Sequence, residues 1–169
     1  GTGTEFLLKV PISLATFRGL LVKAAKRSFI LPADKVERVL RLSVKEVATI
    51  ENCAAIRVDG ELLAVASLAT VLGLETLSDE AEHCQITVLR SGERKIGFIV
   101  DEILQEQEIL AKPLGRQLLR VRNISGAAVI GDGKVVPILH VPDLLKSSSV
   151  NSCVKLRRES LPERKVILL

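Results

Sequence analysis

The sequence predicts a mainly β fold, and three observations support that prediction. First, Asp59-Gly60, Ser91-Gly92 and Asp132-Gly133 each lie between apolar runs. Such pairs favour hairpin turns because glycine adopts a positive φ at little cost. Second, helical patterns are few and short. Third, the chain resembles itself, since residues 54–65 align with residues 127–138.

Strand patterns begin near the N-terminus. Residues 5–10 have a short strand pattern that Pro11 stops, because proline cannot continue a central ladder. Three β-rich segments follow, at residues 20–24, 27–31 and 36–42. Ala25-Lys26 separates the first two, and Pro32-Ala33-Asp34 precedes the third.

Two short helices are expected. Residues 67–72 form the first, with Gly73 as its C-cap, and residues 141–146 form the second, with Pro142 near its start. Residues 76–83 are polar and predict a connecting loop. The tail begins with three serines and continues with basic residues, a composition typical of a solvated linker.

The internal similarity indicates a duplicated β unit. Its two copies span about residues 20–73 and 85–146, and residues 29–31 (Phe-Ile-Leu) also match residues 98–100 (Phe-Ile-Val). Each copy has the size of a small barrel that closes its own edges. The alternative, that two hairpins with Asp-Gly turns resemble each other by chance, stays open.

Composition favours an ordinary globular protein. The 169 residues are 47% apolar and 26% charged, but only 2% aromatic, without Tyr or Trp. Stacking platforms for single-stranded nucleic acids are therefore lacking. The net charge of +4 lies entirely in residues 146–169 (6 − 2 = +4), while residues 1–145 are neutral (18 − 18 = 0). The folded body thus lacks the general excess of basic residues that binding to phosphate backbones requires.

No membrane span or signal peptide is expected, because no apolar run reaches about 18 residues and no cleavage pattern precedes the body. The chain contains no methionine, not even at position 1. We therefore expect it to be a segment of a larger protein.

The cysteines and histidines do not suggest an active site or a metal site. Cys53, Cys84 and Cys153 are odd in number and contain no C-x-x-C, which argues against a disulfide framework or zinc and favours reduced thiols. His83 and Cys84 are adjacent, so a strand points them to opposite faces. His140 lies in an apolar context and is interpreted as structural.

Three charged or glycine-rich segments allow a functional and a structural interpretation. The acidic set Asp101, Glu102, Glu106 and Glu108 could hold a metal or serve as paired carboxylates, but a solvated strand face is favoured. Gly131-Asp132-Gly133 precedes a strand and is interpreted as a turn rather than a phosphate loop. A basic run could contact nucleic acid, but a polar loop is favoured; its residues are Lys112, Arg116, Arg120 and Arg122.

Four segments together resemble the CheW-like domain. They are Arg-Ser-Phe-Ile-Leu-Pro at 27–32, Val-Asp-Glu-Ile-Leu at 100–104, Lys-Pro-Leu-Gly at 112–115, and Ile-Ser-Gly-Ala-Ala-Val-Ile-Gly-Asp-Gly at 124–133. The resemblance covers about residues 20–145. More closely, the chain resembles the regulatory domain at the C-terminal end of CheA-type chemotaxis histidine kinases.

This resemblance implies a fold and a function. The fold would be two intertwined SH3-like five-stranded barrels packed over a shared hydrophobic core, with short helices. The domain would be a regulatory and protein-interaction module without catalysis of its own and without a cofactor. Its partners would be a CheW-type adaptor, the cytoplasmic tips of chemoreceptors and the ATP-binding domain of the same kinase. It would lie in the cytoplasm at receptor arrays, without membrane insertion.

The flanks extend the resemblance to a domain organisation. Residues 1–17 resemble the end of the ATP-binding domain and its junction, and residues 18–146 form the CheW-like domain. Residues 147–169 resemble a linker and the start of a truncated receiver domain, so a hybrid kinase is the implied parent. The alternative function is a nucleic-acid-binding β-barrel that uses residues 112–122 or the basic tail.

Candidate partner contacts lie on both barrels. One barrel offers Leu31, Pro32, Val36 and Val39, and the other offers Ile124, Val129, Ile130 and Asp132. For the apolar ones, a place in the core stays open. Family members often have Arg-Gly and then Pro where this chain has Asp59-Gly60 and then Ala64. They commonly have Asp where His140 stands.

Overall fold

Strands make up most of the part of the chain that the structure describes, as the sequence predicts. The structure is a computed structural model that describes residues 3–4, 6–7, 16–50, 53–75, 82–112, 121–131 and 133–148. Its strands are β1 Thr16–Ala24, β2 Arg27–Pro32, β3 Val36–Ser43, β4 Ala48–Ile50, β5 Cys53–Val58, β6 Glu61–Ser67, β7 His83–Ser91, β8 Arg94–Val100, β9 Glu102–Lys112, β10 Ile124–Ile130 and β11 Lys134–Leu139. Its helices are the 3-10 turns η1 Ala33–Lys35 and η2 Val44–Glu46, and the α-helices α1 Leu68–Val71 and α2 Val141–Ser147.

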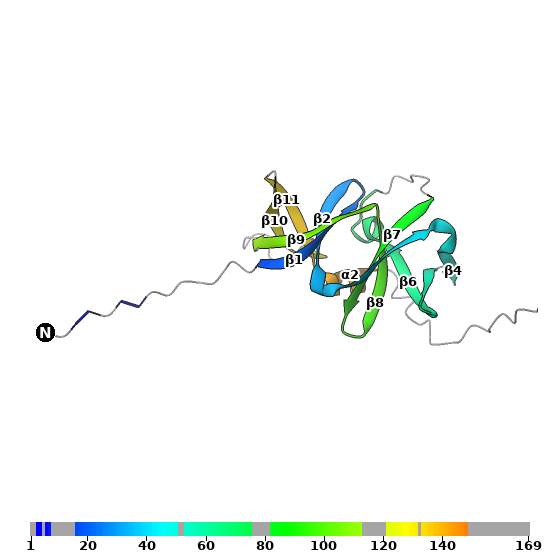
Figure 1. Cartoon of the computed structure of the whole chain (residues 1–169), viewed down its shortest axis with the longest axis horizontal. Helices are drawn as coiled ribbons and strands as arrows, with labels where there is room; N and C mark the ends of the chain where they lie inside the picture. The colour runs from blue at the N-terminus through cyan, green and yellow to red at the C-terminus, as the bar shows by residue number, and fades with distance from the viewer. Residues whose placement is uncertain are drawn as a thin grey trace, which may run out of the picture.

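The first β unit is a closed barrel with the strand order β1-β2-β11-β10-β9 (Figure 1). β1 forms a hairpin with β2 and lies antiparallel to β9 along its other edge. β11 runs parallel to β2 where Ile138 pairs with Ile30. The barrel therefore combines strands from both ends of the described chain and leaves no free strand edge.

The second β unit is a six-stranded sheet with the order β3-β7-β8-β6-β5-β4. Its two end strands, β3 and β4, are consecutive in the chain and are joined only by η2 and Val47. The ends of the sheet must therefore lie near each other, so the sheet curls almost into a barrel. In the first unit, the single long strand β9 pairs with both β1 and β10. The expected fifth strand is thus split into β3 and β4 by η2.

Each unit takes strands from both halves of the chain. β1 and β2 of the first half join β9, β10 and β11 of the second, while β7 and β8 join β3 to β6. The two halves at about residues 20–73 and 85–146 therefore do not form one barrel each. Instead, the units are intertwined, as the family resemblance implies.

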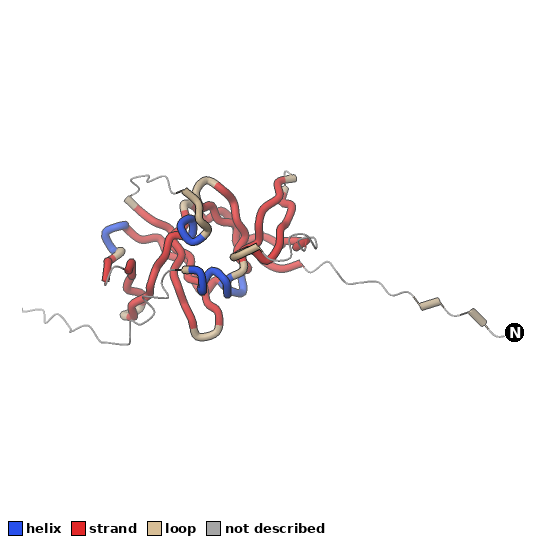
Figure 2. The backbone as a smooth tube through the Cα atoms, turned by 180° about the vertical axis from the view of Figure 1, so that it is seen from behind, coloured by secondary structure: helices blue, strands red, loops and turns tan. Residues whose placement is uncertain are grey.

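The two units share one hydrophobic core, which lies between them. Because successive side chains of a strand point to opposite faces, Leu20 and Val22 of β1 lie in this core, whereas Leu21 lies in the barrel interior. From the other unit, Phe98 and Val100 of β8 enter the same core, and α1 and α2 add Leu68, Leu144 and Leu145. Figure 2 shows both α-helices near the junction of the two units.

Two glycines allow strands to pack closely inside each unit. A Cβ at Gly19 would lie 2.7 Å from side-chain atoms of Ile109 and Ile30. A Cβ at Gly97 would lie 2.7 Å from Val65 and 2.9 Å from Ile86. Because side chains do not tolerate such distances, both positions require glycine for the packing observed.

The expected turns and helices are present where the structure describes them. Asp59-Gly60 and Gly92 have positive φ at the β5–β6 and β7–β8 turns. A further turn, which was not predicted, joins β1 to β2 at Ala25-Lys26, where both residues have positive φ. Phe6 and Leu7 are exposed and do not lie in a strand. Pro11, most of the polar loop at 76–83, Asp132 and residues 149–169 lie outside the described residues.

Candidate partner-binding surfaces

An apolar patch lies on the outer face of the barrel. Val129 of β10 pairs with Val135 of β11, and their exposed fractions are 48% and 68%. On the other side of β10, Ala128 pairs with Ala111, so the same ladder brings Val129 beside Leu110 of β9, which is 40% exposed. Directly opposite residues of antiparallel strands share a face. We call Leu110, Val129 and Val135 the barrel patch.

The candidates of the first half lie around the start of β3. Leu31 is fully buried in the shared core, and Val36 is partly buried against it. Pro32 is partly buried and precedes η1. Val39 is 48% exposed and pairs with Thr87 of β7. Of these four residues, Val39 presents the most accessible apolar side chain to a partner.

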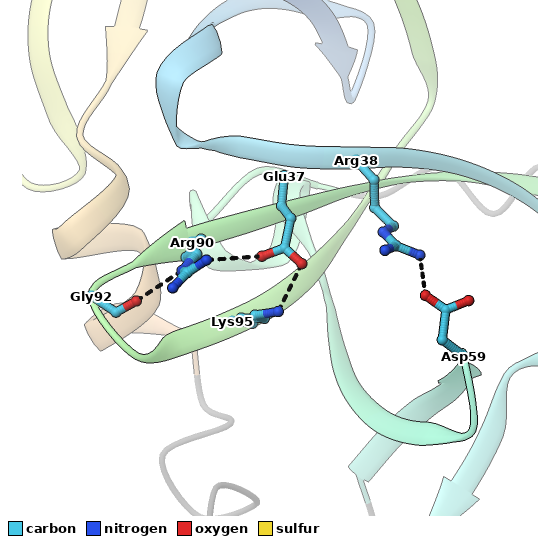
Figure 3. Close-up of polar contacts among 6 residues, drawn as sticks. All are labelled: Glu37, Arg38, Asp59, Arg90, Gly92 and Lys95. Atoms are coloured by element: carbon cyan, nitrogen blue, oxygen red, sulfur yellow. Dashed lines mark hydrogen bonds and ion pairs between the residues drawn. The ribbon is translucent and has the colours of Figure 1, made fainter.

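Charged residues surround this end of β3 (Figure 3). Lys95 Nζ donates to Glu37 Oε1 at 2.7 Å, and Arg90 Nη1 lies 4.0 Å from Glu37 Oε2. The hydrogen bond from Lys95 lowers the pKa of Glu37, and the nearby positive charges lower it further, although burial opposes them. Arg38 Nη1 donates to Asp59 Oδ2 at 2.7 Å. These pairs connect β3 to the β7–β8 and β5–β6 hairpins.

Ile124 and Ile130 line a cavity between the barrel and α1, and both are partly buried. Neither therefore belongs to the exposed barrel patch. Asp132, the last of the proposed contacts, lies outside the described residues. The second-half candidates are thus divided between an outer face, with Val129, and a cavity, with Ile124 and Ile130.

Neither of the two cysteines that the structure describes, Cys53 and Cys84, has the features of a nucleophile. Burial raises the pKa of the Cys84 thiol, the opposite of the change that activates a nucleophile. Its Sγ donates to the Leu42 carbonyl oxygen at 3.7 Å, and the adjacent His83 is exposed. Cys53 is disulfide-bonded, so the expectation of reduced cysteines is wrong for this residue. Sequence spacing could not show this, because pairing depends on distances in the fold.

The acidic residues at the start of β9 connect strands. Glu102 pairs with Lys23 at 2.7 Å, Glu106 pairs with Arg18 at 2.8 Å, and Asp101 accepts from the backbone N–H of Lys26 at 3.2 Å. Within the described ranges, no three His, Cys, Asp or Glu residues are placed to hold a metal ion. The solvated strand face that the sequence favours is consistent with these contacts.

Arg122 is the one residue of the basic run whose side chain lies within the described ranges. Arg122 Nε donates to Ser147 Oγ at 3.0 Å, while Arg116, Arg120 and the side chain of Lys112 lie outside what is described. Nothing observed supports binding of nucleic acid. No helix in the described part of the chain is long and apolar enough to cross a membrane.

Two of the departures from the family pattern, Asp59 and His140, each have a polar partner close by. Asp59, at a position where arginine is common in the family, accepts from Arg38. His140 precedes α2, and its Nδ1 lies 3.0 Å from Asp143 Oδ2, but its side chain makes no capping hydrogen bond. Both residues therefore contribute to local structure.

Two entwined β units that share one hydrophobic core define the fold class of this domain. The chain belongs to the CheW-like domain family, whose pattern matches residues 18–149. Its fold resembles the crystal structure of the scaffolding protein TtCheW from Thermoanaerobacter tengcongensis. The TM-score is 0.63 at 17% identity, over 75% of this chain and 90% of that one.

Curated relatives include a sensor histidine kinase, a chemotaxis protein and a gliding motility regulatory protein. The chain is 31% identical over 154 residues to the sensor histidine kinase CheAY of Helicobacter pylori, covering 89% of this chain and 19% of that protein. It is 30% identical to the chemotaxis protein CheA of Treponema pallidum, with coverages of 85% and 18%. It is 32% identical to the gliding motility regulatory protein of Myxococcus xanthus, with coverages of 86% and 19%. The chain thus spans about a fifth of these relatives.

Sequence reasoning missed Leu110 and Val135 as exposed apolar residues. A signal for Val135 exists, because Val135 and Val136 are adjacent in a strand and must point to opposite faces. One of the two therefore has to lie outside the barrel. The alternation cannot tell which one until the strand register is known.

Proposed function

We propose that this domain is the regulatory domain of a CheA-type kinase and binds a CheW-type adaptor through the barrel patch. The observation that supports this proposal best is the row of Leu110, Val129 and Val135 on three neighbouring strands. An exposed apolar row with polar surroundings is typical of a protein interface. Adaptor and domain would share a fold, so contacts between their barrels can be pseudo-symmetric.

Contacts with other partners complete the proposal. Val39 and Val36 near the start of β3 are proposed to contact a second adaptor or the cytoplasmic tip of a chemoreceptor. The junction before β1 is proposed to connect to the ATP-binding domain of the same kinase, with a receiver domain after residue 147. The domain would then work in the cytoplasm at receptor arrays, where receptor state shifts the population of active kinase.

Calorimetric titration with the CheW-type adaptor encoded beside the parent kinase tests the proposal. We expect saturable one-to-one binding, and we expect Val129→Lys to weaken it about tenfold or more, because a charge would be buried in an apolar contact. Val44→Lys is the matched control, since Val44 is 49% exposed but lies on η2 of the other unit.

Two results would contradict the proposal. The first is no heat of binding from a domain whose thermal unfolding is cooperative. The second is equal weakening by Val129→Lys and Val44→Lys, which would show that the barrel patch is not the interface. ATP hydrolysis by the purified chain would separately contradict its non-catalytic role.

A further inference from the structure

A cavity of about 900 Å³ lies between α1 and the barrel. Its apolar lining includes Val71 and Leu72 at the end of α1, Phe29 of β2, and Ile124, Ile130 and Val136 of β10 and β11. This volume falls in the upper part of the range of ligand-binding clefts. Val135 of the barrel patch also lines the cavity, whereas Val129 and Leu110 do not, so the cavity adjoins the barrel patch at Val135.

The internal duplication allows the residues beside the cavity to be compared with the aligned residues of the second half. The alignment that places Ala54 on Ala127 also places Val71 and Leu72 on Leu144 and Leu145 of α2. Leu144 and Leu145 are buried, and α2 packs against β7 and β8. Val71 and Leu72, by contrast, are only partly buried.

The difference between the two helices begins at Gly73. Its φ of 69° ends α1 after Val71, whereas α2 continues through Lys146 and Ser147 at the aligned positions. β2 is the counterpart of β8, since Phe29 aligns with Phe98. The cavity therefore lies between α1 and β2, where the second half has a helix packed directly on its strand.

The charge of the residues that line the cavity indicates which kind of ligand it could bind. The ionisable residues that line the cavity are Arg27, Arg122 and Lys134, all of them basic. The Arg27 guanidinium has no ion pair within the part of the chain described here. Arg122 donates to Ser147 through Nε, and Ser147 donates to Asn123 Oδ1 at 2.8 Å, so this wall is held by hydrogen bonds.

We propose that the cavity binds a short amphipathic helix of a partner protein, with an apolar stripe facing Val71 and Leu72 and acidic residues facing Arg27 and Arg122. The bound helix would take the place that the last turn of α2 occupies in the other half. Apolar side chains at i, i+3, i+4 and i+7 suit such a groove. This inference goes beyond the proposed function, since it concerns the cavity that adjoins the barrel patch and a helical partner.

The test uses a fluorescein-labelled synthetic peptide of about four helical turns, with leucine at i, i+3, i+4 and i+7 and glutamate elsewhere. Fluorescence anisotropy with the full chain is expected to show saturable binding. A peptide with glutamine in place of glutamate should bind at least several-fold more weakly. In NMR spectra, backbone amides of Leu72 and Gly73 should shift, while those of β4 should not.

Charge reversal provides the specific control. Arg27→Glu should weaken binding of the acidic peptide about tenfold and restore binding of a peptide with lysine in place of glutamate. Arg94→Glu, an exposed residue at the start of β8 outside the cavity, should change neither. The proposal is overturned if the acidic peptide does not bind, if the amide shifts lie elsewhere, or if Arg27→Glu and Arg94→Glu act alike. Adaptor binding is measured separately on Val129→Lys, so failure of one proposal leaves the other standing.

Discussion

Glu37 lies close to two basic side chains near the start of β3. It accepts from Lys95 at 2.7 Å and lies near Arg90, while its neighbour Arg38 pairs with Asp59. Each of these pairs is largely solvated, and an exposed ion pair contributes little stability on its own. Their more direct effect is to fix the side chains around Val39, which is a candidate contact.

The first prediction concerns Glu37 and pH. Because its pKa in the folded state lies below the ordinary value of 4.5, the carboxylate stabilises the fold above that pH. This contribution is lost as the pH falls through the lowered pKa. Glu37→Gln should therefore reduce the loss of stability between pH 7 and about 3, measured by urea unfolding.

The matched control for this prediction is Glu93→Gln, which changes a carboxyl in the β7–β8 turn that makes none of the ion pairs described above. It should leave the pH dependence of unfolding close to that of the unchanged chain. Identical pH profiles for Glu37→Gln and the unchanged chain would refute the role assigned to Glu37.

Single residues also show that the sequence could not predict which of the candidate contacts are exposed. The sequence proposed Val129 and Ile130 together, but only Val129 is exposed on the barrel, whereas Ile130 lines the cavity. Adjacent apolar residues in a strand always face opposite sides, and the sequence does not tell which side faces solvent. Leu31 likewise lies in the shared core rather than on a surface.

At the scale of elements, the two α-helices begin differently although they occupy aligned positions. Ser67 accepts from the backbone N–H of Thr70 at 3.3 Å and caps α1. His140 occupies the same place before α2 and makes no side-chain capping hydrogen bond. Backbone N–H groups in the first turn of α2 thus lack the side-chain acceptor that α1 has.

We therefore expect His140→Ser to stabilise the domain. A serine N-cap contributes about 1 kcal/mol, which should raise the melting temperature by about 2–4 °C. Asp143 stays in the first turn, where its charge favours the helix dipole. Calorimetry on His140→Ser and His140→Ala separates the effects, because alanine loses the contact with Asp143 without adding a cap. Equal melting temperatures for the two variants would show that capping is not the limiting feature.

Short elements were largely predictable from the sequence. The turns at Asp59-Gly60 and Ser91-Gly92 and both α-helices follow from local chemistry, which depends on neighbouring residues only. The split of one strand into β3 and β4 was not predicted. Its local cause is a capping box, in which the Ser43 side chain accepts from the backbone of η2 and Glu46 bonds back to the Ser43 N–H.

At the scale of the whole molecule, the two repeats exchange strands. The sequence revealed the repeats but assigned each to its own barrel, because self-similarity does not say which strands pair. Pairing of β1 with β9 joins segments far apart in the chain, and no local pattern encodes it. The intertwined arrangement could be expected only from resemblance to the CheW-like family.

Strand exchange predicts that neither half folds alone. Residues 1–75 would leave β1 and β2 without β9 and β11, and residues 76–169 would leave β7 and β8 without β3 and β6. When produced separately, each half should give the NMR spectrum of an unfolded chain. When produced together, they should form a one-to-one complex with the spectrum of the intact domain. Cooperative thermal unfolding of either half alone would contradict this arrangement.

The closed barrel also has a consequence for synthesis on the ribosome. Thr16 of β1 pairs with Leu110 of β9, so β1 leaves the ribosome long before β9 has been synthesised. Contacts between such distant segments slow folding, since a long loop must close before they form. Until then, the apolar hairpin of β1 and β2 has an open edge that invites pairing with other nascent chains. The open edge of β1 can therefore be covered by β9 only after the ribosome has translated the middle of the chain.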